Sequence, residues 1–283
     1  MAATRSDNEA RKRGYLQEGF RLFHLKDSVA PAFDYHYHEF DKVVLQLGGK
    51  VVYNVEGRSY FLKPYDILLV GRNMIHRPAI DPSEPYERMV LWLGSDYLAA
   101  HSTEDCWLEN CFALAERRHF HLMRPRGEDR LRYRGLFERL EEAQADKAFG
   151  GELLADTCLL QLLIALNRDV LPEPAADDAA YRFDPKMEEI TKFIGEHLAE
   201  DLSIDRLAGE FYLSRYYLMH RFKEVYGITI HQYIRQKRLL RAAEDIRRGT
   251  PVLKAAMEAG FNDYSAFLRA FQAAYGMSPR EWK

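Results

Sequence analysis

The chain of 283 residues contains only three cysteines and no long run of apolar residues. Cys106, Cys111 and Cys158 form neither an even set nor a C-x-x-C pair, so a disulfide framework is excluded and we interpret them as reduced thiols. A membrane-spanning helix needs about 18 consecutive apolar residues, and no segment reaches that length. The polar first residues also lack the apolar core of a secretory signal. We therefore expect a cytoplasmic protein without a membrane partner.

A strong charge of either sign is also missing. The chain has 40 Lys and Arg against 43 Asp and Glu, a net charge of −3 at pH 7. The balance differs along the chain, because residues 186–283 carry 16 basic and 13 acidic residues, whereas residues 1–185 carry 24 and 30. A mildly basic C-terminal third permits nucleic-acid binding without requiring it. The length itself predicts about two domains.

Residues 15–93 have the pattern of short β-strands. In the stretch KVVLQLGGKVVYNVEGRSYFLKPYDILLVG, β-branched and aromatic runs alternate with the turn signals GG, EG and PYD. The run YERMVLWLG completes the series. This spacing is typical of hairpins in an all-β sandwich or barrel.

The pattern then changes to helices. Residues 128–145 and 151–170 carry apolar residues at i, i+3, i+4 and i+7, with a Gly-Gly pair between the two segments. The second helix is apolar on nearly every side. Its apolar residues include Leu153, Leu154, Leu159, Leu160, Leu162, Leu163, Ile164 and Leu166. Such a helix needs cover on more than one side, from the β domain or from a second subunit, and we expect residues 152–167 to form a homodimer contact.

A repeated unit follows in the last third of the chain. We place the first domain at residues 15–170, a Pro-, Ala- and Asp-rich linker at residues 171–185 and a helical domain at residues 186–283. In the helical domain, a short helix, a tight turn and a second helix occur twice, as LAGEFYLSRYYLMHRF and AMEAGFNDYSAFLRAF, on either side of a long helix over residues 230–246. This order matches the helix-turn-helix, whose second helix lies in the major groove of DNA. A generic helical hairpin that packs on its neighbours is the alternative.

Capping residues mark the ends of these helices. Ser203 and Ser214 are good N-caps in the first unit, and Asn262 or Asp263 caps the last helix after Gly260 has ended the helix before it. Small residues beside each turn predict a close crossing of the two helices. They are the pairs Ala208-Gly209 and Ala259-Gly260.

The helical domain also carries a connected series of motifs. They are Leu218, Phe222-Lys223, Gly227, Arg238 to Ala242, Gly260-Phe261, Phe267 to Phe271 and Gly276 to Pro279. This series resembles the signature of the double helix-turn-helix of AraC/XylS-type transcription regulators, and it covers nearly all of the domain. Two positions depart from that signature. Gln272 stands where a Lys is usual and His220 where an Arg is common, and each change weakens an expected contact to phosphate or guanine.

Each second helix has an inner and an outer face. The inner residues Leu218, Phe222, Phe267 and Phe271 recur at i, i+4 spacing, which predicts core positions. The resemblance implies that the outer residues contact DNA, with a solvated surface position as the alternative for each. Expected at base edges are Tyr216, Met219, His220, Tyr264, Ser265, Leu268 and Arg269, and expected at phosphates are Ser214, Arg215 and Lys223. A bidentate arginine on guanine is the commonest specific contact, which makes Arg269 the strongest candidate.

The β half contains a second group of candidates, in FDYHYHEFDKVVLQLGG and KPYDILLVGRNMIHRP. If residues 36–42 form one strand, alternation places His36, His38 and Lys42 on the same face. A His-x-His, a following Gly, a Pro-x-Asp turn and the distant His76 resemble the cupin barrel, which in the AraC/XylS family forms the effector-binding domain. The resemblance implies that His36, His38, Lys42 and His76 bind the effector.

The chemistry of this group depends on Lys42. Three imidazoles could bind a divalent metal, as in metal-using cupins, but Lys42 stands where those cupins carry a glutamate ligand, and its charge repels a metal ion. We expect no metal and no cofactor, and we interpret the histidines as structural or as ligand contacts.

A buried ammonium without a partner is costly, which predicts that the effector is a small organic anion or a sugar derivative with acidic groups. A carboxylate of the chain is the alternative counter-ion, although alternation aims two of the three candidates at the opposite strand face. The three are Glu39, Asp41 and Asp66.

Together these features predict an α+β protein of two domains, an N-terminal cupin-like β-barrel with a helical dimerisation segment and a C-terminal all-α double helix-turn-helix. We expect a sequence-specific transcription regulator without catalytic residues. It would bind double-stranded promoter or operator DNA under the control of a small-molecule effector, and it would contact RNA polymerase if it is an activator. Two alternatives stay open, a metal-dependent cupin enzyme with a helical appendage and a helical protein-interaction module that no longer binds DNA.

Overall fold

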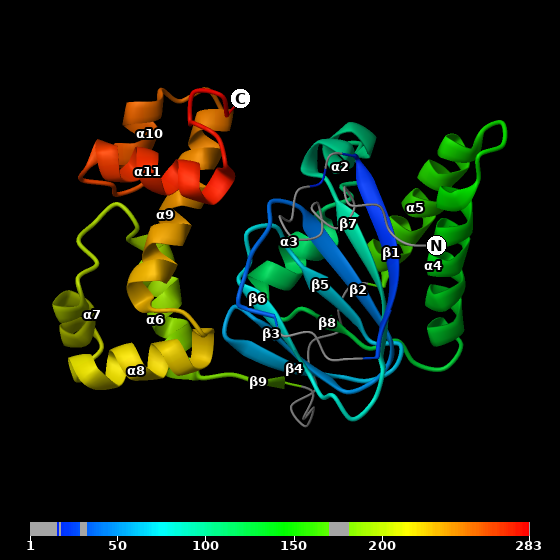
Figure 1. Cartoon of the computed structure of the whole chain (residues 1–283), viewed down its shortest axis with the longest axis horizontal. Helices are drawn as coiled ribbons and strands as arrows, with labels where there is room; N and C mark the ends of the chain where they lie inside the picture. Colours follow the sequence, from blue (N-terminus) through cyan, green and yellow to red (C-terminus); the bar gives the residue numbers. More distant parts are fainter. Residues whose placement is uncertain (1–15, 17, 29–32, 170–180, 283) are drawn as a thin grey trace. The chain divides into compact units, whose positions relative to one another are not determined.

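The computed structural model describes residues 16, 18–28, 33–169 and 181–282. The chain divides into two compact units, Met1–Arg182 and Phe183–Lys283 (Figure 1). Most of the expected linker, residues 171–180, lies outside the described residues, and so does residue 15, where the first domain is expected to begin. None of the described helices is long and apolar enough to cross a membrane.

Two antiparallel sheets form the β half of the first unit. In spatial order the larger sheet is β1-β7-β2-β5-β8 and the smaller sheet is β6-β3-β4-β9. The strands are β1 (Phe20–Asp27), β2 (Asp41–Gly48), β3 (Val51–Val55), β4 (Arg58–Leu62), β5 (Ile67–Val70), β6 (His76–Ile80), β7 (Tyr86–Leu93), β8 (Leu122–Met123) and β9 (Tyr181–Arg182). The cupin-like β half expected from the sequence is confirmed, although the described strands form two facing sheets and do not close into a barrel.

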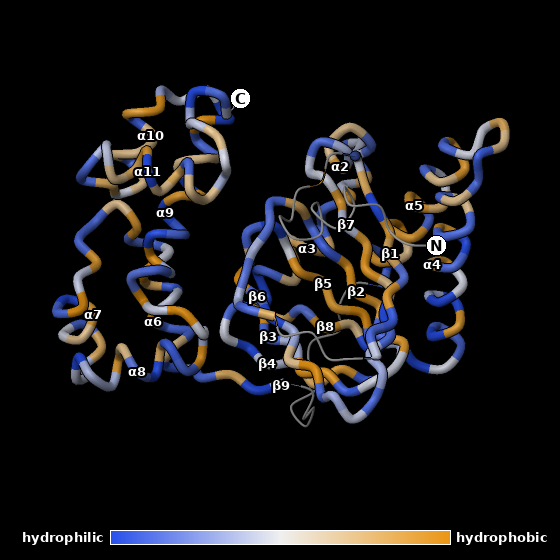
Figure 2. Tube along the Cα trace, viewed as in Figure 1, coloured by the Kyte–Doolittle hydropathy of each residue, from blue (hydrophilic) through white to orange (hydrophobic). Residues whose placement is uncertain are grey.

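Strand β2 contributes residues to two hydrophobic cores, one on each face of the larger sheet. Val43 and Leu45 belong to a core that also contains helix residues, whereas Val44 belongs to the core between the two sheets, together with Val55 and Tyr60 of the smaller sheet. A strand that is buried on both faces needs apolar residues at successive positions. Figure 2 shows the strands of the larger sheet mostly in the colour of hydrophobic residues.

Helices cover the other face of the larger sheet. They are α2 (Ser95–His101), α3 (Asn110–Arg117), α4 (Asp129–Ala145) and α5 (Gly151–Arg168), and the sequence predicts only the last two. The turn between α4 and α5 requires glycine, because Gly150 has a φ of 81° and a Cβ on Gly151 would lie 2.6 Å from the carbonyl oxygen of Asp146. The expected break at this Gly-Gly pair is therefore confirmed.

The apolar residues of α5 fall into two sets. Buried in the core of the first unit are Leu159, Leu162, Leu163 and Leu166. On the other side, Leu153 and Leu154 are 68% and 48% exposed, and Leu160 and Ile164 are half-buried. The β half and α4 thus cover most of the helix, and one apolar stripe stays uncovered by the described residues.

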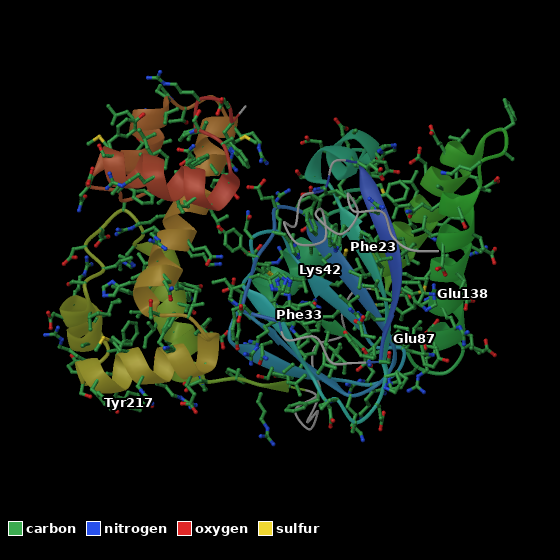
Figure 3. The ribbon with its side chains drawn as sticks, viewed as in Figure 1. Phe23, Phe33, Lys42, Glu87, Glu138 and Tyr217 are labelled. Atoms are coloured by element: carbon green, nitrogen blue, oxygen red, sulfur yellow. The ribbon has the colours of Figure 1, made fainter. Side chains whose placement is uncertain are left out.

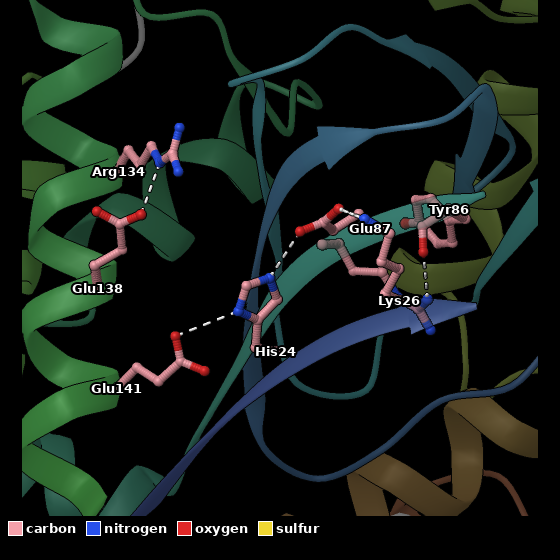
Figure 4. A network of polar contacts seen from close by, with 8 residues as sticks. His24, Lys26, Tyr86, Glu87, Arg134, Glu138 and Glu141 are labelled. Carbon is pink, nitrogen blue, oxygen red and sulfur yellow. Dashed lines mark hydrogen bonds and ion pairs between the residues drawn. The ribbon is translucent and has the colours of Figure 1, made fainter. Parts of the chain in front are cut away.

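Polar contacts also hold α4 against the sheet (Figure 4). His24 of β1 lies between two carboxylates, with Nδ1 3.3 Å from Oε2 of Glu141 in α4 and Nε2 3.1 Å from Oε1 of Glu87 in β7. Lys26 Nζ lies 2.7 Å from the other carboxylate oxygen of Glu87. Exposed ion pairs of this kind contribute about 0 to 1 kcal/mol each, so the apolar core carries most of the stability of this contact.

The second unit is entirely helical in its described part. Its helices are α6 (Pro185–Glu196), α7 (Ile204–Glu210), α8 (Arg215–Tyr226), α9 (Ile230–Arg247), α10 (Val252–Glu258) and α11 (Tyr264–Tyr275). The caps expected at Ser203 and Ser214 are confirmed, and Asp263 rather than Asn262 caps α11. Thr229 caps α9 in a capping box with Gln232, which the sequence interpretation missed. Each helix-turn-helix unit, α7–α8 and α10–α11, is present.

The small pairs expected at the helix crossings, Ala208-Gly209 and Ala259-Gly260, behave differently in their alanines and their glycines. A Cβ on Gly209 would meet nothing within 4 Å, so this glycine has no packing role. Gly260 does need to be glycine, because its φ is 95° and because a Cβ there would meet Leu198 and Arg238 first. Ala208 and Ala259 are buried, and it is these small side chains that pack inside each unit.

Candidate functional site

Helices α8 and α11 are the second helices of the two units, and their inner faces are as predicted. Leu218, Phe222, Phe267 and Phe271 are each 0% exposed. At the start of α8, the Ser214 hydroxyl accepts a hydrogen bond from the Tyr217 N–H at 3.2 Å. At the start of α11, the Asp263 carboxylate accepts one from the Ser265 N–H at 2.8 Å. Both helices therefore begin at a defined residue, and their first turns present the outer side chains.

The outer faces differ between the two helices. Exposed on α8 and its cap are Ser214, Arg215, Tyr216, Met219, His220 and Lys223, and exposed on α11 are Ser265 and Arg269. Tyr264 and Leu268, in contrast, are half-buried and pack against the core of the second unit. These two side chains therefore face outward only in part, because together with Phe267 and Phe271 they complete an i, i+3, i+4, i+7 stripe.

Two exposed tyrosines beside these residues were missed. Tyr212 in the turn between α7 and α8 is 95% exposed with a φ of 54°, and Tyr217 on α8 is 47% exposed. Figure 3 shows Tyr217 pointing away from the helical unit. Tyr216 stacks on His220 with 5.5 Å between the ring centroids. The signal for Tyr212 was its place in the short turn between α7 and α8, where a side chain that is not anchored in the core faces solvent.

One of the expected phosphate contacts has a partner inside the unit. Arg215 Nη1 lies 3.1 Å from Oδ1 of Asp205 in α7, and both side chains are well exposed. An exposed ion pair of this kind is weak, so Arg215 can exchange Asp205 for a phosphate at little cost.

In the β half, Lys42, which is labelled in Figure 3, and three histidines come together. Lys42 Nζ donates a hydrogen bond to Nε2 of His76 at 2.8 Å, and both side chains are buried. The ring of His76 lies 4.3 Å from that of His36 and 4.7 Å from that of His38. Strand β2 begins only at Asp41, so His36 and His38 precede it, and His36 instead forms a bridge with His76. The expected group is assembled, but by this bridge rather than by one continuous strand.

Hydrogen bonds to the backbone define the protonation of the rings. The Nδ1 atoms of His36, His38 and His76 donate to the carbonyl oxygens of residues 34, 40 and 74, at 2.9, 2.7 and 2.9 Å. In a neutral ring the Nε2 atom is then an acceptor. His76 accepts from Lys42, whereas Nε2 of His38 is buried and has no hydrogen-bond partner among the described residues.

Burial keeps this group close to neutral. It lowers the pKa of Lys42 to about 7, and the charge of Arg88 acts in the same direction. Burial, followed by the charge of Lys42, holds the pKa of His38 and His76 well below the usual value. The pKa of His36 is lowered for the same two reasons. The imidazoles are therefore neutral at pH 7, and Lys42 carries the titratable positive charge.

The strand opposite Lys42 adds a further polar atom. Lys42 of β2 pairs in register with Trp92 of β7, and the indole Nε1 of Trp92 is buried without a hydrogen-bond partner among the described residues. Two of the carboxylates considered as counter-ions have other partners, since Asp66 forms an ion pair with Arg124 and Asp41 accepts from the N–H of Arg72. Buried polar atoms without partners are rare, which makes His38 and Trp92 candidate contacts of a bound molecule.

The described residues give no support to a metal centre. They contain no group of three or more His, Cys, Asp or Glu side chains that could hold a metal ion. At His76 the free lone pair of the ring accepts from Lys42.

Comparisons with known proteins agree with this arrangement. Residues 24–163 match the family model described as AraC-like ligand binding domain, and residues 207–283 match the model described as helix-turn-helix domain. The probable transcriptional regulator LumQ of Photobacterium leiognathi is 27% identical over 250 residues, which cover 88% of this chain and 91% of LumQ. The activator RhaS of Salmonella arizonae is 24% identical over 268 residues, covering 88% and 87%. The regulatory protein SoxS of Salmonella typhimurium is 33% identical over 95 residues, covering 33% of this chain and 89% of SoxS.

Proposed function

Because the chain belongs to the AraC/XylS family of transcription regulators, we propose that α8 and α11 read DNA with the side chains that they expose. The chain is a sequence-specific DNA-binding regulator, and a small-molecule effector in its β domain modulates that binding. The observation that carries the proposal is the pair of capped helices, each anchored by buried aromatic or leucine residues and exposed on the opposite face.

The exposed residues divide by chemistry. Arg269 has a planar guanidinium that can bind guanine with two hydrogen bonds, and Tyr216, Met219, His220 and Ser265 lie within one turn of a helix start or on the same outer face. Ser214, Arg215 and Lys223 suit phosphates, because hydroxyl and cationic groups at the margin of a reading helix position it on the backbone. Tyr264 and Leu268 are half-buried, and we propose that the exposed part of each side chain contributes apolar contact to a thymine methyl group.

For the effector we propose a small hydroxy acid or acidic sugar derivative, held by His36, His38, Lys42 and His76. Its acidic group would accept from Lys42, and its hydroxyl groups would satisfy the two buried atoms without partners, by donating to His38 Nε2 and accepting from Trp92 Nε1. His76 gives Lys42 a neutral hydrogen-bond partner, and the acidic group of the ligand supplies the counter-charge. No cofactor is needed for this role.

The relatives also bear on the alternatives. LumQ and RhaS are named as transcription regulators and align with most of this chain, which disfavours a cupin enzyme with a helical appendage. RhaS is named as an activator. On that basis we propose that this protein activates transcription by contacting RNA polymerase at its promoters, in the cytoplasm where that DNA lies.

Selection of double-stranded DNA from a random-sequence library tests the function directly. We expect the purified protein to enrich one sequence whose half-sites each contain two recognised blocks, one for α8 and one for α11. We also expect a mixture of acidic metabolites to change its affinity for that sequence. Enrichment of no sequence by the folded protein would favour the alternative of a helical interaction module.

The uncovered stripe of α5 supports a homodimer. Leu153, Leu160 and Ile164 recur at i, i+7 and i+11, so they lie on one side of the helix, and Leu153 is 68% exposed. We propose that two chains pair through this stripe and present two helical units to two DNA half-sites.

We expect Leu153→Glu to convert the dimer into a monomer without unfolding it, because the side chain is exposed in the single chain and a buried glutamate pair at the interface is costly. Sedimentation at micromolar concentration measures the change. Leu131→Glu on α4, where the side chain is also 68% exposed but lies off the stripe, is a control for the added charge. Leu163 is 0% exposed, so Leu163→Glu would test folding rather than pairing. A parent protein that sediments as a monomer would contradict the proposal.

A further inference from the structure

The two helix-turn-helix units approach each other at Arg238, in the middle of α9. Its Nε donates a hydrogen bond to the carbonyl oxygen of Leu198 at 2.9 Å, and its Nη2 donates to that of Glu200 at 2.7 Å. Both acceptors lie in the segment between α6 and α7, which leads into the first helix-turn-helix, α7–α8. A planar guanidinium with two such bonds fixes the position of this segment against α9.

Gly260, in the turn of the second unit, closes on the same place. A Cβ at this position would lie 2.2 Å from the carbonyl oxygen of Leu198 and 2.8 Å from Nε of Arg238. A hollow of about 280 Å³ lies beside this contact, and Arg238, Phe261 and Asn262 are among the residues that line it. The turn before α11 therefore touches the segment that leads into α7–α8, and it also touches Arg238, which holds that segment. We call this contact of Leu198, Arg238 and Gly260 the junction.

Away from the junction, each unit packs on its own part of α9. In the first helix-turn-helix, Tyr233 of α9 packs against Phe222 and Tyr226, with ring centroids 5.4 Å apart in both pairs. In the second helix-turn-helix, Leu239 of α9 belongs to a core with Phe267. A continuous helix sets the distance between two such cores, but the rotation of each unit around the helix depends on side-chain contacts. The junction is a contact of this kind, because it joins parts of both units.

We infer that Arg238 is a positioning residue, which fixes the rotation of α11 relative to α8 and so selects the spacing between the two DNA blocks that the helices recognise. This inference rests on the proposal that both helices bind DNA. One base pair of added spacing moves a block by about 3.4 Å along the DNA and rotates it by roughly 35°. A rigid pair of reading helices accepts one spacing, whereas a loosened pair accepts several.

The test compares the parent with Arg238→Met on DNA duplexes that differ only in spacing. The parent first selects its operator from a random-sequence library, and one base pair is then inserted or deleted inside a half-site, between the blocks that α8 and α11 of one chain recognise. We expect each altered spacing to weaken binding by the parent about tenfold or more, and to weaken binding by Arg238→Met about threefold or less. The base preferences inside each block should stay the same, because the reading residues are unchanged.

Two further variants separate positioning from stability. Arg241→Met removes a neighbouring arginine of α9 whose partner is Asp245, outside the junction, and should keep the spacing preference of the parent. Arg238→Lys keeps a cationic donor and should show an intermediate penalty for altered spacing. Thermal unfolding of every variant monitors the fold.

The outcomes distinguish this inference from the proposed function. If Arg238→Met and Arg238→Lys weaken binding equally at all spacings, or leave the spacing penalty unchanged, Arg238 supports only stability and the inference is wrong. If the parent selects no DNA at all, the proposed DNA binding fails, and the inference fails with it.

Discussion

Replacing Lys42 by methionine is expected to remove the response to acidic effectors, with a loss of affinity of about 30-fold or more. Lys42 is buried, and its ammonium is the titratable cation that faces His36, His38 and His76. Removing one partner of a buried charge pair leaves the acidic group of the ligand desolvated and unpaired. Methionine has a similar length, so the shape of the site is nearly kept.

The pH dependence gives this prediction a sign. Burial has lowered the pKa of Lys42 to about 7, and a bound anion favours the ammonium, so binding raises this pKa and takes up a proton. The affinity of the parent for an acidic ligand should therefore fall as the pH rises above 7, by up to about tenfold per unit. The histidines do not contribute to this pH dependence above pH 7, because burial lowers their pKa values below the ordinary value of 6.5 and they are already neutral there. Lys42→Met should show no such slope.

A thermal-shift screen of neutral and acidic metabolites, at pH 7 and pH 8.5, measures both effects. Lys50→Met is the matched control, because Lys50 is an exposed lysine in the turn between β2 and β3 and pairs with Glu84. Stabilisation of the parent by neutral ligands alone would exclude an anionic effector. Equal stabilisation of parent and Lys42→Met by acidic ligands would exclude Lys42 as its contact.

Arg269→Ala is expected to weaken binding to the selected operator by about 1 to 3 kcal/mol and to relax the preference at one base pair. Arg269 is exposed on α11 and has no ion-pair partner among the described residues, so its guanidinium is available for a base edge. Lys223→Ala should instead weaken binding to all sequences alike and reduce the salt dependence by about one phosphate contact.

Repeating the selection with each variant, and measuring affinity at two salt concentrations, separates the two roles. Arg139→Ala removes an exposed arginine of α4, in the other unit, and controls for the loss of one positive charge. The assignment fails if Arg269→Ala keeps both the affinity and the base preferences of the parent, or if Lys223→Ala changes the preferred sequence.

The sequence by itself determined most of the elements of this protein and their order. The caps at Ser203 and Ser214, the breaks at the glycines after α4 and α8, and the inner face with Phe222 and Phe267 could all be predicted. Each of these signals acts within about four residues of the chain, through a cap hydrogen bond, a positive φ or a helical repeat. Short helices such as α2 and α3 carry too few repeats to be recognised this way.

Only the tertiary structure decided which side chains meet. Lys42 and His76 are 34 positions apart and come from different sheets, so neither their hydrogen bond nor the lowered pKa of Lys42 could be read from the spacing of the histidines. The same holds for Arg238, which is 40 positions from Leu198, and for the half-buried positions of Tyr264 and Leu268. Local periodicity fixes the face of a residue only relative to its own helix or strand. Which neighbour lies opposite that face, and how much water it excludes, is set by the packing of elements that are distant in the chain.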